Sequence, residues 1–314
     1  MQNLQAAEIN NIIAIFKKRF GENFRENHIL ADYTTFKIGG PARMFIKCEA
    51  RDDIIDAVNM AYDNNLRFFI VGGGSNLLIS DNGYPGLIIH IANTGIEVTN
   101  EYIEAEAGYD WEELVDYSCR NGLGGLVGMA GIKGQVGGAV HGNAGAFGTS
   151  VADILIEAEI LKPGGEPRWE ANKYFAFSYR NSILKKTNEI VLRARFRYVS
   201  EKPVVLLKKQ DEILELRNQR HPRKDCSAGC FFKNIEKADE PYGKLAAGFL
   251  LEKVGAKGMH IGGAGVFEKH ANILINASGK ARAEDVRKLA EALKKKVKDE
   301  YGYNLEEEIT FLGD

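Results

Sequence analysis

The stretch AGIKGQVGGAVHGNAGAFG, residues 130–148, decides how the rest of this chain can be interpreted. Six of the residues from 134 to 148 are glycine, and most of their neighbours are small. Backbone without side chains can approach other groups closely, but it cannot fill space itself. We therefore expect a flat ring system and a pyrophosphate to lie on this segment. A packed glycine loop that supports a domain interface is the alternative.

A second glycine cluster, VGGGSNL at residues 71–77, follows a short apolar run at 68–71 that predicts a strand. A strand that runs into three glycines exposes successive backbone N–H groups, which suits a phosphate. Ser75 and Asn76 add side-chain donors. The segment is not a dinucleotide-binding fingerprint, because that motif needs a helix after the glycines, whereas 77–79 predicts another strand. A tight loop between strands is the alternative.

Hydrophobic periodicity predicts a mixed α/β content. The predicted helices cover 2–20, 51–64, 110–121, 204–219, 283–301 and a segment near 243–254. The predicted strands are 68–71, 77–79, 87–89, 154–162, 189–199, 272–276 and a last one near 307–312. The helix at 204–219 should end at His221-Pro222, since proline disfavours helix in the residue before it. These patterns indicate a two-lobed α+β unit over 1–200 and a smaller α/β unit over 215–314.

Composition excludes several classes of protein. The 314 residues carry 41 basic and 43 acidic side chains, so no broad positive field favours nucleic acid. The four cysteines form no CxxC pair, which is typical of reduced thiols in a cytosol. No apolar run reaches the ~18 residues of a membrane span, and no signal peptide is evident. We expect a soluble cytoplasmic monomer. We also expect no metal site, because the spacing of His221, Cys226 and Cys230 matches no zinc-binding pattern.

Three further motifs contain residues suited to chemistry. Arg180, in FSYRNS at 177–182, has forked donors that match a carboxylate, although alone it suggests a structural salt bridge. Cys230, in SAGCFFKN at 227–234, precedes two aromatic residues, a lysine and an amide. That arrangement suits a proton donor beside an anion-binding pair, with a buried inert thiol as the alternative. In LEEEI at 305–309, strand alternation would place Glu306 and Glu308 on one face.

These motifs occur in one order along the chain, and together they resemble the UDP-N-acetylenolpyruvoylglucosamine reductase (MurB) family over residues 30–314. The resemblance rests on TTFKIGGPA (34–42), VGGGSNLL (71–78), AGIKGQVGGAVHGNAGAFG (130–148), FSYRNS (177–182), AGCFFKN (228–234), AAGFLLEKVGAKG (246–258), KHANILIN (269–276) and LEEEI (305–309). The substrate domain has no room for a long insertion. In this respect the chain resembles the shorter subclass of the family.

The resemblance implies a fold and its domain limits. It implies an α+β protein with a two-lobed FAD-binding domain of the vanillyl-alcohol-oxidase (PCMH) type over 30–200. An N-terminal helical segment, 1–29, would precede it, and a smaller α/β substrate-binding domain would occupy 215–314.

The resemblance also implies which residues act. Arg180 and Glu308 match the positions that stabilise an enolic intermediate, and Glu308 would have to be protonated or share a proton to do so. Cys230 takes the position of the proton donor, where the family usually has serine. Lys233 and Asn234 match positions near the substrate diphosphate. The implied FAD cradle consists of Ile38, Val71, Gly72, Gly73, Gly74, Ser75, Asn76, Leu77, Ala130, Gly131, Gly134, Gly137, Gly138, Ala139, Asn143, Ala144 and Gly145.

The implied reaction belongs to bacterial peptidoglycan synthesis. NADPH would reduce FAD, and the flavin would then reduce the enolpyruvyl ether of UDP-N-acetylglucosamine enolpyruvate to the lactyl ether of UDP-N-acetylmuramate. Two alternatives remain at this point. One is an FAD oxidoreductase of the same fold with another substrate, in which AGCFFKN and LEEEI should not match. The other is a non-catalytic module that binds a nucleotide-sugar or flavin, which would not need an arginine, a proton donor and an acid together.

Overall fold

The computed structural model describes residues 6–222, 226–239 and 243–313 and divides into two compact units. Two segments from the N-terminal half of the chain fold with the C-terminal third rather than with their neighbours in sequence. The first unit comprises Met1–His28, Ala42–Gly73 and Gly86–Glu215, and the second comprises Ile29–Pro41, Gly74–Pro85 and Leu216–Asp314. The domain limits derived from the sequence remain a prediction, because compact units and functional domains need not coincide.

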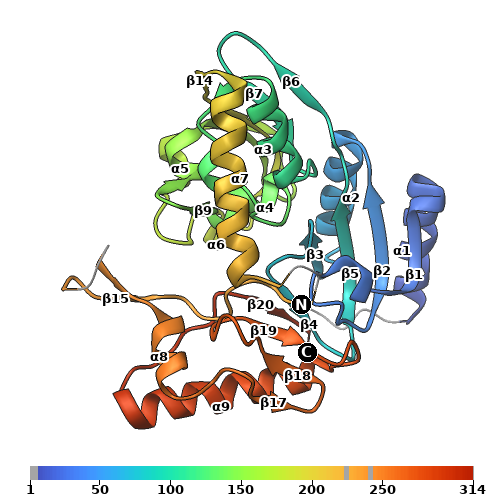
Figure 1. Ribbon diagram of the computed structural model, residues 1–314. Helices are drawn as coiled ribbons and strands as arrows, with labels where there is room; N and C mark the ends of the chain where they lie inside the picture. Colours follow the sequence, from blue (N-terminus) through green and yellow to red (C-terminus); the bar gives the residue numbers. More distant parts are fainter. Residues whose placement is uncertain (1–5, 223–225, 240–242, 314) are drawn as a thin grey trace. The chain divides into compact units, whose positions relative to one another are not determined.

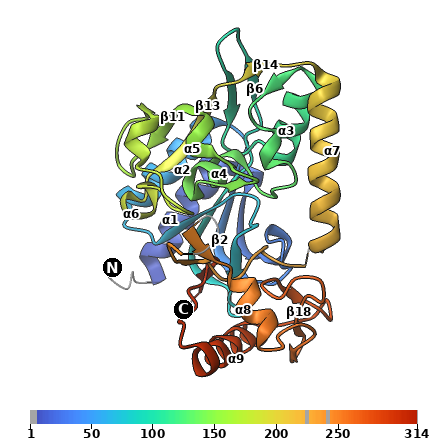
Figure 2. The same cartoon turned by 60° about the vertical axis from the view of Figure 1, so that its left-hand side comes forward.

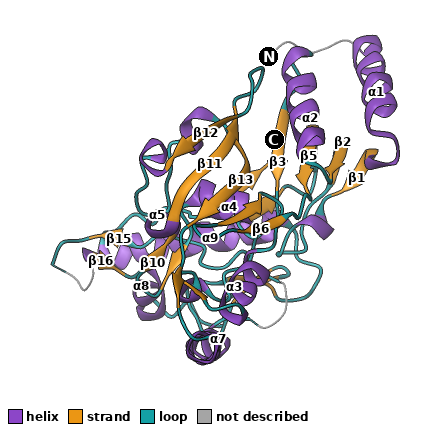
Figure 3. Ribbon diagram, turned by 90° about the horizontal axis from the view of Figure 1, so that it is seen from above, coloured by secondary structure: helices purple, strands orange, loops and turns teal. Residues whose placement is uncertain are grey.

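The first unit begins with a four-stranded sheet of order β1-β2-β5-β3. Helices α1 (Ala6–Phe20) and α2 (Arg51–Asp63) lie along one side of this sheet (Figures 1 and 3). The pairing of β3 with β5 is parallel. The strands are β1 (Phe24–Ile29), β2 (Pro41–Cys48), β3 (Phe68–Val71) and β5 (Tyr84–Ile91).

The helix α2 forms where its sequence pattern predicts it. Ile54, Ala57, Val58 and Ala61 recur at helical spacing, and all four are fully buried. The predicted helices 51–64 and 204–219 and the strand 68–71 are thereby confirmed within a residue or two. The helix predicted over 2–20 is confirmed from Ala6 onward, and its first residues lie outside the described part of the chain.

The first unit also contains a five-stranded antiparallel sheet of order β12-β11-β13-β7-β6. Helix α4 packs beside this sheet, where Gly137 N–H donates to Ala107 O at 2.8 Å. The strands are β6 (Ile96–Val98), β7 (Ile103–Glu106), β11 (Leu155–Leu161), β12 (Arg168–Ala171) and β13 (Ile190–Phe196). The longer helices of this part are α3 (Trp111–Arg120), α4 (Val136–Gly142) and α7 (Pro203–Arg220).

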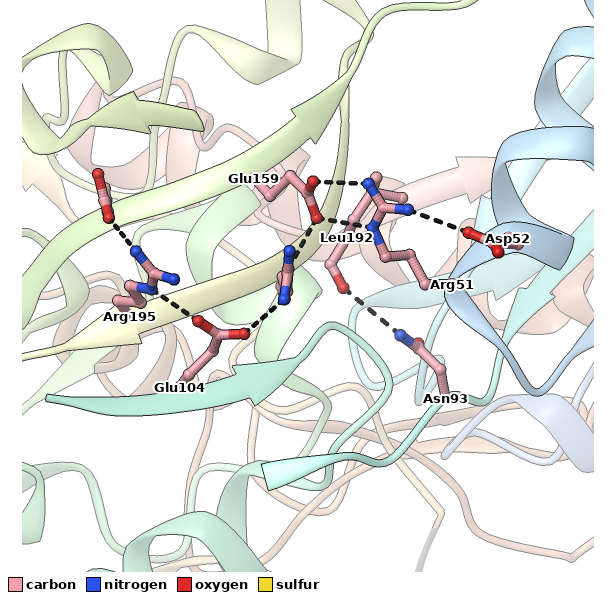
Figure 4. A network of polar contacts seen from close by, with 9 residues as sticks. Arg51, Asp52, Asn93, Glu104, Glu159, Leu192 and Arg195 are labelled. Carbon is pink, nitrogen blue, oxygen red and sulfur yellow. Dashed lines mark hydrogen bonds and ion pairs between the residues drawn. The ribbon is translucent and has the colours of Figure 1, made fainter. Parts of the chain in front are cut away.

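A chain of alternating charges lies within the first unit and joins α2 to the five-stranded sheet (Figure 4). Arg51 makes a bidentate ion pair with Glu159, with distances of 2.7 and 2.9 Å. Arg193 donates to Glu159 at 2.8 Å and to Glu104 at 2.8 Å. Arg195 continues the chain to Glu104 at 2.6 Å. The Glu159 side chain is only 6% exposed, so its charge depends on these two guanidinium groups.

Replacing Glu159 by alanine is expected to destabilise the first unit by about 2–3 kcal/mol, because Arg51 and Arg193 would each lose one of two carboxylate partners at a mostly buried position. The melting temperature should fall by about 5–10 °C. Burial alone would raise the pKa of Glu159, but hydrogen bonds from Arg51 and Arg193 outweigh it and lower the pKa. The stabilisation is therefore complete above the ordinary pKa of 4.5 and is lost as the pH falls through the lowered pKa.

Thermal unfolding of Glu159→Ala and the parent protein across the acid range measures this prediction. The difference in melting temperature between the two proteins should be largest at neutral pH and should disappear at acid pH. Glu49→Ala is the control, since Glu49 pairs with Lys47 on the exposed surface and should leave the melting temperature unchanged. A difference in melting temperature that does not depend on pH would show that the charge of the Glu159 carboxylate does not stabilise the unit.

The second unit has its own core, in which Phe36 and Leu78 pack with side chains from the C-terminal third. Strand β4 (Leu77–Ile79) pairs in parallel with β20 (Thr310–Leu312). The antiparallel sheet β17-β18-β19 contacts helix α9 (Ala283–Tyr301), as Figure 1 labels them and Figure 2 shows for β18 and α9. The remaining members are α8 (Ala247–Lys253), β17 (His260–Ile261), β18 (Ala264–Val266) and β19 (Leu274–Asn276).

The helix predicted over 283–301 is confirmed at both ends, with Gly302 in the left-handed conformation as its C-terminal stop. The strand predicted near 307–312 is regular only over Thr310–Leu312. Short elements complete the chain. They are β8 (Leu123–Gly124), β9 (Gly145–Ala146), β10 (Thr149–Ser150), α5 (Val151–Ile154), α6 (Leu184–Thr187), β14 (Val199–Ser200), β15 (Ile235–Glu236) and β16 (Lys244–Leu245). None of the helices in the described ranges has the length and apolar character that crossing a membrane requires.

Candidate active site

The two predicted glycine clusters meet within the first unit. A Cβ added at Gly73 would lie 3.1 Å from the Cα of Gly134, so the two backbones approach closely and a side chain at Gly73 would be crowded. A Cβ added at Gly72 would lie 2.7 Å from the Oε1 of Gln135. Val71, which precedes the glycines, is fully buried at the end of β3. The structure thus brings 71–73 and 134–135 together, as a shared cradle requires.

Helix α4 begins directly after this contact and is built on a glycine-rich sequence. Val136, Ala139 and Val140 are buried, whereas Gly138 is exposed and a Cβ added there would meet nothing within 4 Å. Gly137 packs tightly, because a Cβ added there would lie 3.0 Å from the Cβ of Ala107. The helix therefore presents bare backbone at Gly138 on its open face.

The entry to the glycine segment packs in the interior of the first unit. Ala130 is buried and donates its N–H to Val127 O, and Gly131 follows with a φ of +71°. Ala130 and Gly131 therefore shape the backbone of the segment.

Asn143, at the end of α4, has a structural role that its sequence context did not reveal. It adopts the left-handed conformation, with φ +48°, and is 7% exposed. Its Nδ2 donates to Ser178 O at 2.9 Å, and its Oδ1 accepts the N–H of Ala152 at 3.0 Å. Ala144 then pairs its N–H with Ala139 O. The Asn143 side chain thereby ties the glycine segment to the FSYRNS turn.

Arg180 occupies that turn. Ser178 and Asn181 exchange both backbone hydrogen bonds, and Arg180, with a φ of +54°, stands at the third position. A positive φ there is the type II turn pattern, which favours glycine. Arg180 Nη1 donates to Gly145 O at 3.1 Å, and Lys185 Nζ donates to Arg180 O at 2.7 Å. The protein thus holds a large cationic side chain at a backbone position that costs conformational energy.

The rest of the VGGGSNL motif belongs to the second unit. A Cβ added at Gly74, whose φ is +59°, would lie 1.9 Å from Tyr33 O, so no other residue fits. Asn76 Nδ2 donates to Glu308 O at 3.1 Å, and Leu77 pairs with Thr310. Ile38 is buried, and its backbone exchanges hydrogen bonds with the Thr34 hydroxyl. Ser75 lies partly exposed between Gly74 and Asn76.

The segments that contain Cys230 and Glu308 are joined by backbone hydrogen bonds in the second unit. The N–H of Glu308 donates to the carbonyl of Phe231 at 2.8 Å, directly after Cys230. Cys230 itself forms an antiparallel bridge with Ile273. Both predicted catalytic side chains are partly exposed rather than buried. The alternative of a buried inert thiol therefore does not describe Cys230.

Asn272 is a positioning residue that the sequence reading missed. Its side chain is 2% exposed and bonds both backbone groups of Phe232, accepting from its N–H at 2.9 Å and donating to its carbonyl at 2.8 Å. Its own carbonyl accepts the N–H of Phe231 at 2.8 Å. Nothing in the sequence distinguished Asn272 from the other polar residues of the motif KHANILIN.

Lys233 and Asn234 continue this segment. Lys233 Nζ lies 3.3 Å from a Glu306 oxygen in an exposed pair. Asn234 Oδ1 accepts the N–H of Ala247 at 3.1 Å, at the start of α8. Glu307 points elsewhere, to Lys294 of α9 at 2.7 Å. Lys233 and Glu306 thus share a face away from Glu307, in keeping with the predicted alternation.

A hollow of about 460 Å³ lies on the first unit beside α3 and α7. Its lining includes Tyr109, Glu113 and Gln210, and of the predicted cofactor residues it contains only Gly131. The hollow therefore shares only Gly131 with the predicted site. Within the described ranges, no set of three histidine, cysteine or acidic residues is arranged to hold a metal ion.

Comparison with known proteins identifies the family. The family described as the C-terminal domain of UDP-N-acetylenolpyruvoylglucosamine reductase matches residues 221–312, and the FAD binding domain family matches 42–169. The reductase of that name from Caldicellulosiruptor bescii is 38% identical over 303 residues, or 96% of this chain and 94% of that protein. This chain belongs to the UDP-N-acetylenolpyruvoylglucosamine reductase family.

Further relatives support the assignment over the whole length. The Bacillus subtilis protein of the same name is 33% identical over 316 residues and covers 100% of this chain and 98% of that protein. The crystal structure of the reductase from Thermus caldophilus superposes with a TM-score of 0.77 at 32% identity, covering 91% of this chain and 97% of the other. The predicted fold class, an FAD-binding domain of the PCMH type with a smaller C-terminal domain, is thereby confirmed, and the chain is an FAD-dependent oxidoreductase.

The first unit has features that suit FAD. Bare backbone at Gly73 and Gly138 is open to solvent, where a large planar or phosphate-bearing group can approach without meeting a side chain. The buried Oε1 of Gln135, which lies where the two glycine clusters meet, has no hydrogen-bond partner among the described residues. A buried acceptor without a donor is costly, so a polar ligand group nearby would offset that cost.

Proposed function

We propose that this chain reduces UDP-N-acetylglucosamine enolpyruvate to UDP-N-acetylmuramate with electrons from NADPH. The observation that supports the proposal is the hydrogen bond from Glu308 N–H to the carbonyl of Phe231, which joins the backbones of the LEEEI and AGCFFKN segments. Relatives across 90% or more of the chain, named for this reductase, support the same reaction. The proposed setting is bacterial peptidoglycan synthesis, with the enzyme acting as a monomer.

FAD, when bound, would supply the hydride chemistry between NADPH and the enolpyruvyl ether. Backbone of the glycine clusters would hold its pyrophosphate and ring, chiefly at 71–74 and 134–139. The closeness of Gly73 to Gly134 supports this role, because it brings backbone without side chains from both clusters to one place. Asn143 would act indirectly, since its amide is committed to Ser178 and Ala152.

Replacing Gly138 by alanine should weaken FAD binding about tenfold without harming the fold. The new Cβ meets nothing in the protein, and alanine is a better helix former than glycine by up to about 1 kcal/mol. A ligand lying on this backbone would, however, be pushed away. Titration of the FAD-free protein with FAD, followed by flavin fluorescence, gives the dissociation constant, and thermal unfolding checks the fold.

Gly74→Ala is the matched comparison. Its Cβ would clash with Tyr33 O, so both stability and FAD binding should be lost together. If Gly138→Ala binds FAD as tightly as the parent protein, Gly138 does not belong to the cofactor cradle.

Arg180 and Glu308 would act on the charge that develops in the substrate. Hydride addition to the terminal methylene carbon leaves negative charge on the neighbouring carbon and its carboxylate. Arg180, whose Nη1 also donates to Gly145 O, would stabilise that carboxylate electrostatically. Glu308, protonated or sharing a proton, would stabilise the enolic oxygen.

Cys230 would complete the reaction. Its Sγ–H bond would break as the proton moves to the carbon that bears the carboxylate, which yields the lactyl ether, and the thiolate would regain a proton from solvent. Lys233 would contact the substrate diphosphate through its ammonium group. Asn234 would contribute its Nδ2, since its Oδ1 is engaged by Ala247.

An anaerobic two-step experiment tests the proposed function. The FAD-loaded protein is bleached with NADPH, and UDP-N-acetylglucosamine enolpyruvate is then added. Bleaching followed by return of the flavin absorbance supports the reaction as proposed. A flavoprotein that NADPH bleaches but the enolpyruvyl substrate does not reoxidise would be an oxidoreductase with another substrate. A protein that binds no FAD would overturn the proposal.

A further inference from the structure

The turn that carries Arg180 has a backbone conformation that needs support. Arg180 has a φ of +54°, which is disfavoured for residues other than glycine. Ser178 and Asn181 close the turn with two backbone hydrogen bonds of 3.1 Å each, but these bonds do not attach the turn to the rest of the unit. A disfavoured conformation persists only where the surrounding structure holds it. The contacts that hold this turn therefore control the position of Arg180.

Two buried side chains attach the turn to helix α4, one on each side of Arg180. Asn143, the residue that ends α4, is 7% exposed and donates from Nδ2 to Ser178 O at 2.9 Å. Ser182 is fully buried and donates from Oγ to His141 O, in the last turn of α4, at 2.7 Å. The turn is thus bonded to α4 both two residues before Arg180 and two residues after it.

Asn143 is itself held in a defined orientation. Its φ is +48°, a conformation that asparagine tolerates better than most residues, and its Oδ1 accepts the N–H of Ala152 at 3.0 Å. Both ends of its amide are therefore bonded to backbone groups. Gly145, two residues further along the chain, accepts the hydrogen bond from Arg180 Nη1 at 3.1 Å. The segment after α4 thus bonds both to the backbone of the turn and to the guanidinium of Arg180.

We propose that Asn143 and Ser182 are positioning residues that fix Arg180 relative to helix α4 of the proposed FAD cradle. The inference rests on the proposed function, in which Arg180 stabilises the charge that develops on the substrate carboxylate. A guanidinium does so efficiently only when its donors are already aimed, and a displacement of about 1 Å can cost about 10²-fold in rate. Asn143 and Ser182 would therefore affect substrate reduction through Arg180, without contacting the substrate.

The first variant is Asn143→Gly, which removes both bonds of the amide and keeps a residue that suits the positive φ. In anaerobic stopped-flow measurements it should slow flavin reoxidation by the enolpyruvyl substrate by about tenfold to hundredfold. Reduction of FAD by NADPH and the dissociation constant of FAD should change by no more than about threefold, because Arg180 takes no part in them. Asn188→Gly is the matched control and should change neither half-reaction, since Asn188 has a similar φ of +55° in the same unit but is exposed.

Ser182→Ala is the second variant, and it decides the question if Asn143→Gly does not fold. It removes one hydroxyl and with it the bond to His141 O. It should slow the same half-reaction about tenfold. Thermal unfolding of the FAD-loaded variants identifies the temperature range in which all of them are folded, and the rates are compared within that range.

Combining each variant with Arg180→Lys separates positioning from general support of the fold. If Asn143 and Ser182 act through Arg180, Arg180→Lys should slow reoxidation much less in either variant than in the parent protein. Losses that multiply in full would overturn the proposal, and so would parent rates of reoxidation in the folded variants. A comparable loss of FAD affinity would place Asn143 in the cofactor cradle instead. A parent protein that NADPH bleaches but the enolpyruvyl substrate does not reoxidise would overturn the proposed function, and this inference with it.

Discussion

Replacing Arg180 by lysine is expected to slow flavin reoxidation by UDP-N-acetylglucosamine enolpyruvate by about 10²–10³-fold, the usual cost of losing one preorganised donor to a developing anion. Lysine keeps the positive charge but loses the forked geometry that matches a carboxylate. It also loses the particular donor that binds Gly145 O and fixes the direction of the side chain. Reduction of FAD by NADPH should change by no more than a few-fold, because no carboxylate charge develops in that step.

Anaerobic stopped-flow measurement of the two half-reactions separates these effects. Arg197→Lys is a matched control, since Arg197 is an exposed arginine elsewhere in the first unit. Lys185→Ala probes positioning, because Lys185 Nζ bonds the Arg180 carbonyl. Its effect on reoxidation should be smaller than that of Arg180→Lys. An equal loss in both half-reactions would indicate that Arg180 supports the cofactor site rather than the substrate anion.

The regular elements could be predicted from sequence because their patterns are local. Helix α9 could be predicted from the helical spacing of its apolar residues and the glycine that follows it. Helix α2 could be predicted from its apolar stripe alone. Helix α4 could not be predicted this way. Its sequence, VGGAVHG, has poor intrinsic helix propensity, and tertiary contacts such as Gly137 N–H to Ala107 O hold it instead.

Local sequence patterns also could not predict that segments of the two units alternate along the chain. Segments 29–41 and 74–85 pack with the C-terminal third through contacts more than two hundred residues apart in sequence, such as Asn76 with Glu308 and Phe36 with Asn276. No spacing rule predicts pairings of that range. The motif VGGGSNL is therefore divided, with 71–73 in the first unit and 74–77 in the second.

The residues proposed to act in the candidate site could be predicted from their types. The residues that position the backbone around them could not. The side chains of Arg180 and Cys230 are of types that commonly take part in catalysis. Their roles were implied by the resemblance of the ordered motifs to the family. Asn143 and Asn272 act through backbone hydrogen bonds, which asparagine can make at almost any position. Only the folded chain shows which backbone groups these two amides bind.

Alkylating Cys230 is expected to stop substrate reduction and to spare the oxidation of NADPH. The thiol is the proposed proton donor, and losing a general acid typically costs about 10²–10⁴-fold in rate. Cys48 and Cys119 are fully buried, and burial raises the pKa of both thiols, so they should not react. Cys226 is partly exposed like Cys230, so the experiment requires a Cys226→Ser background.

In that background, iodoacetamide should abolish flavin reoxidation by the enolpyruvyl substrate while NADPH still bleaches the flavin. Cys230→Ala should reproduce the loss without any reagent. Cys230→Ser should keep the activity, because a hydroxyl can donate the same proton, and should make the enzyme resistant to the reagent. Mass spectrometry confirms complete modification at one site. If both half-reactions survive full alkylation of Cys230, the proton comes from another group, and the proximity of Glu308 to this segment makes that carboxyl the next residue to replace.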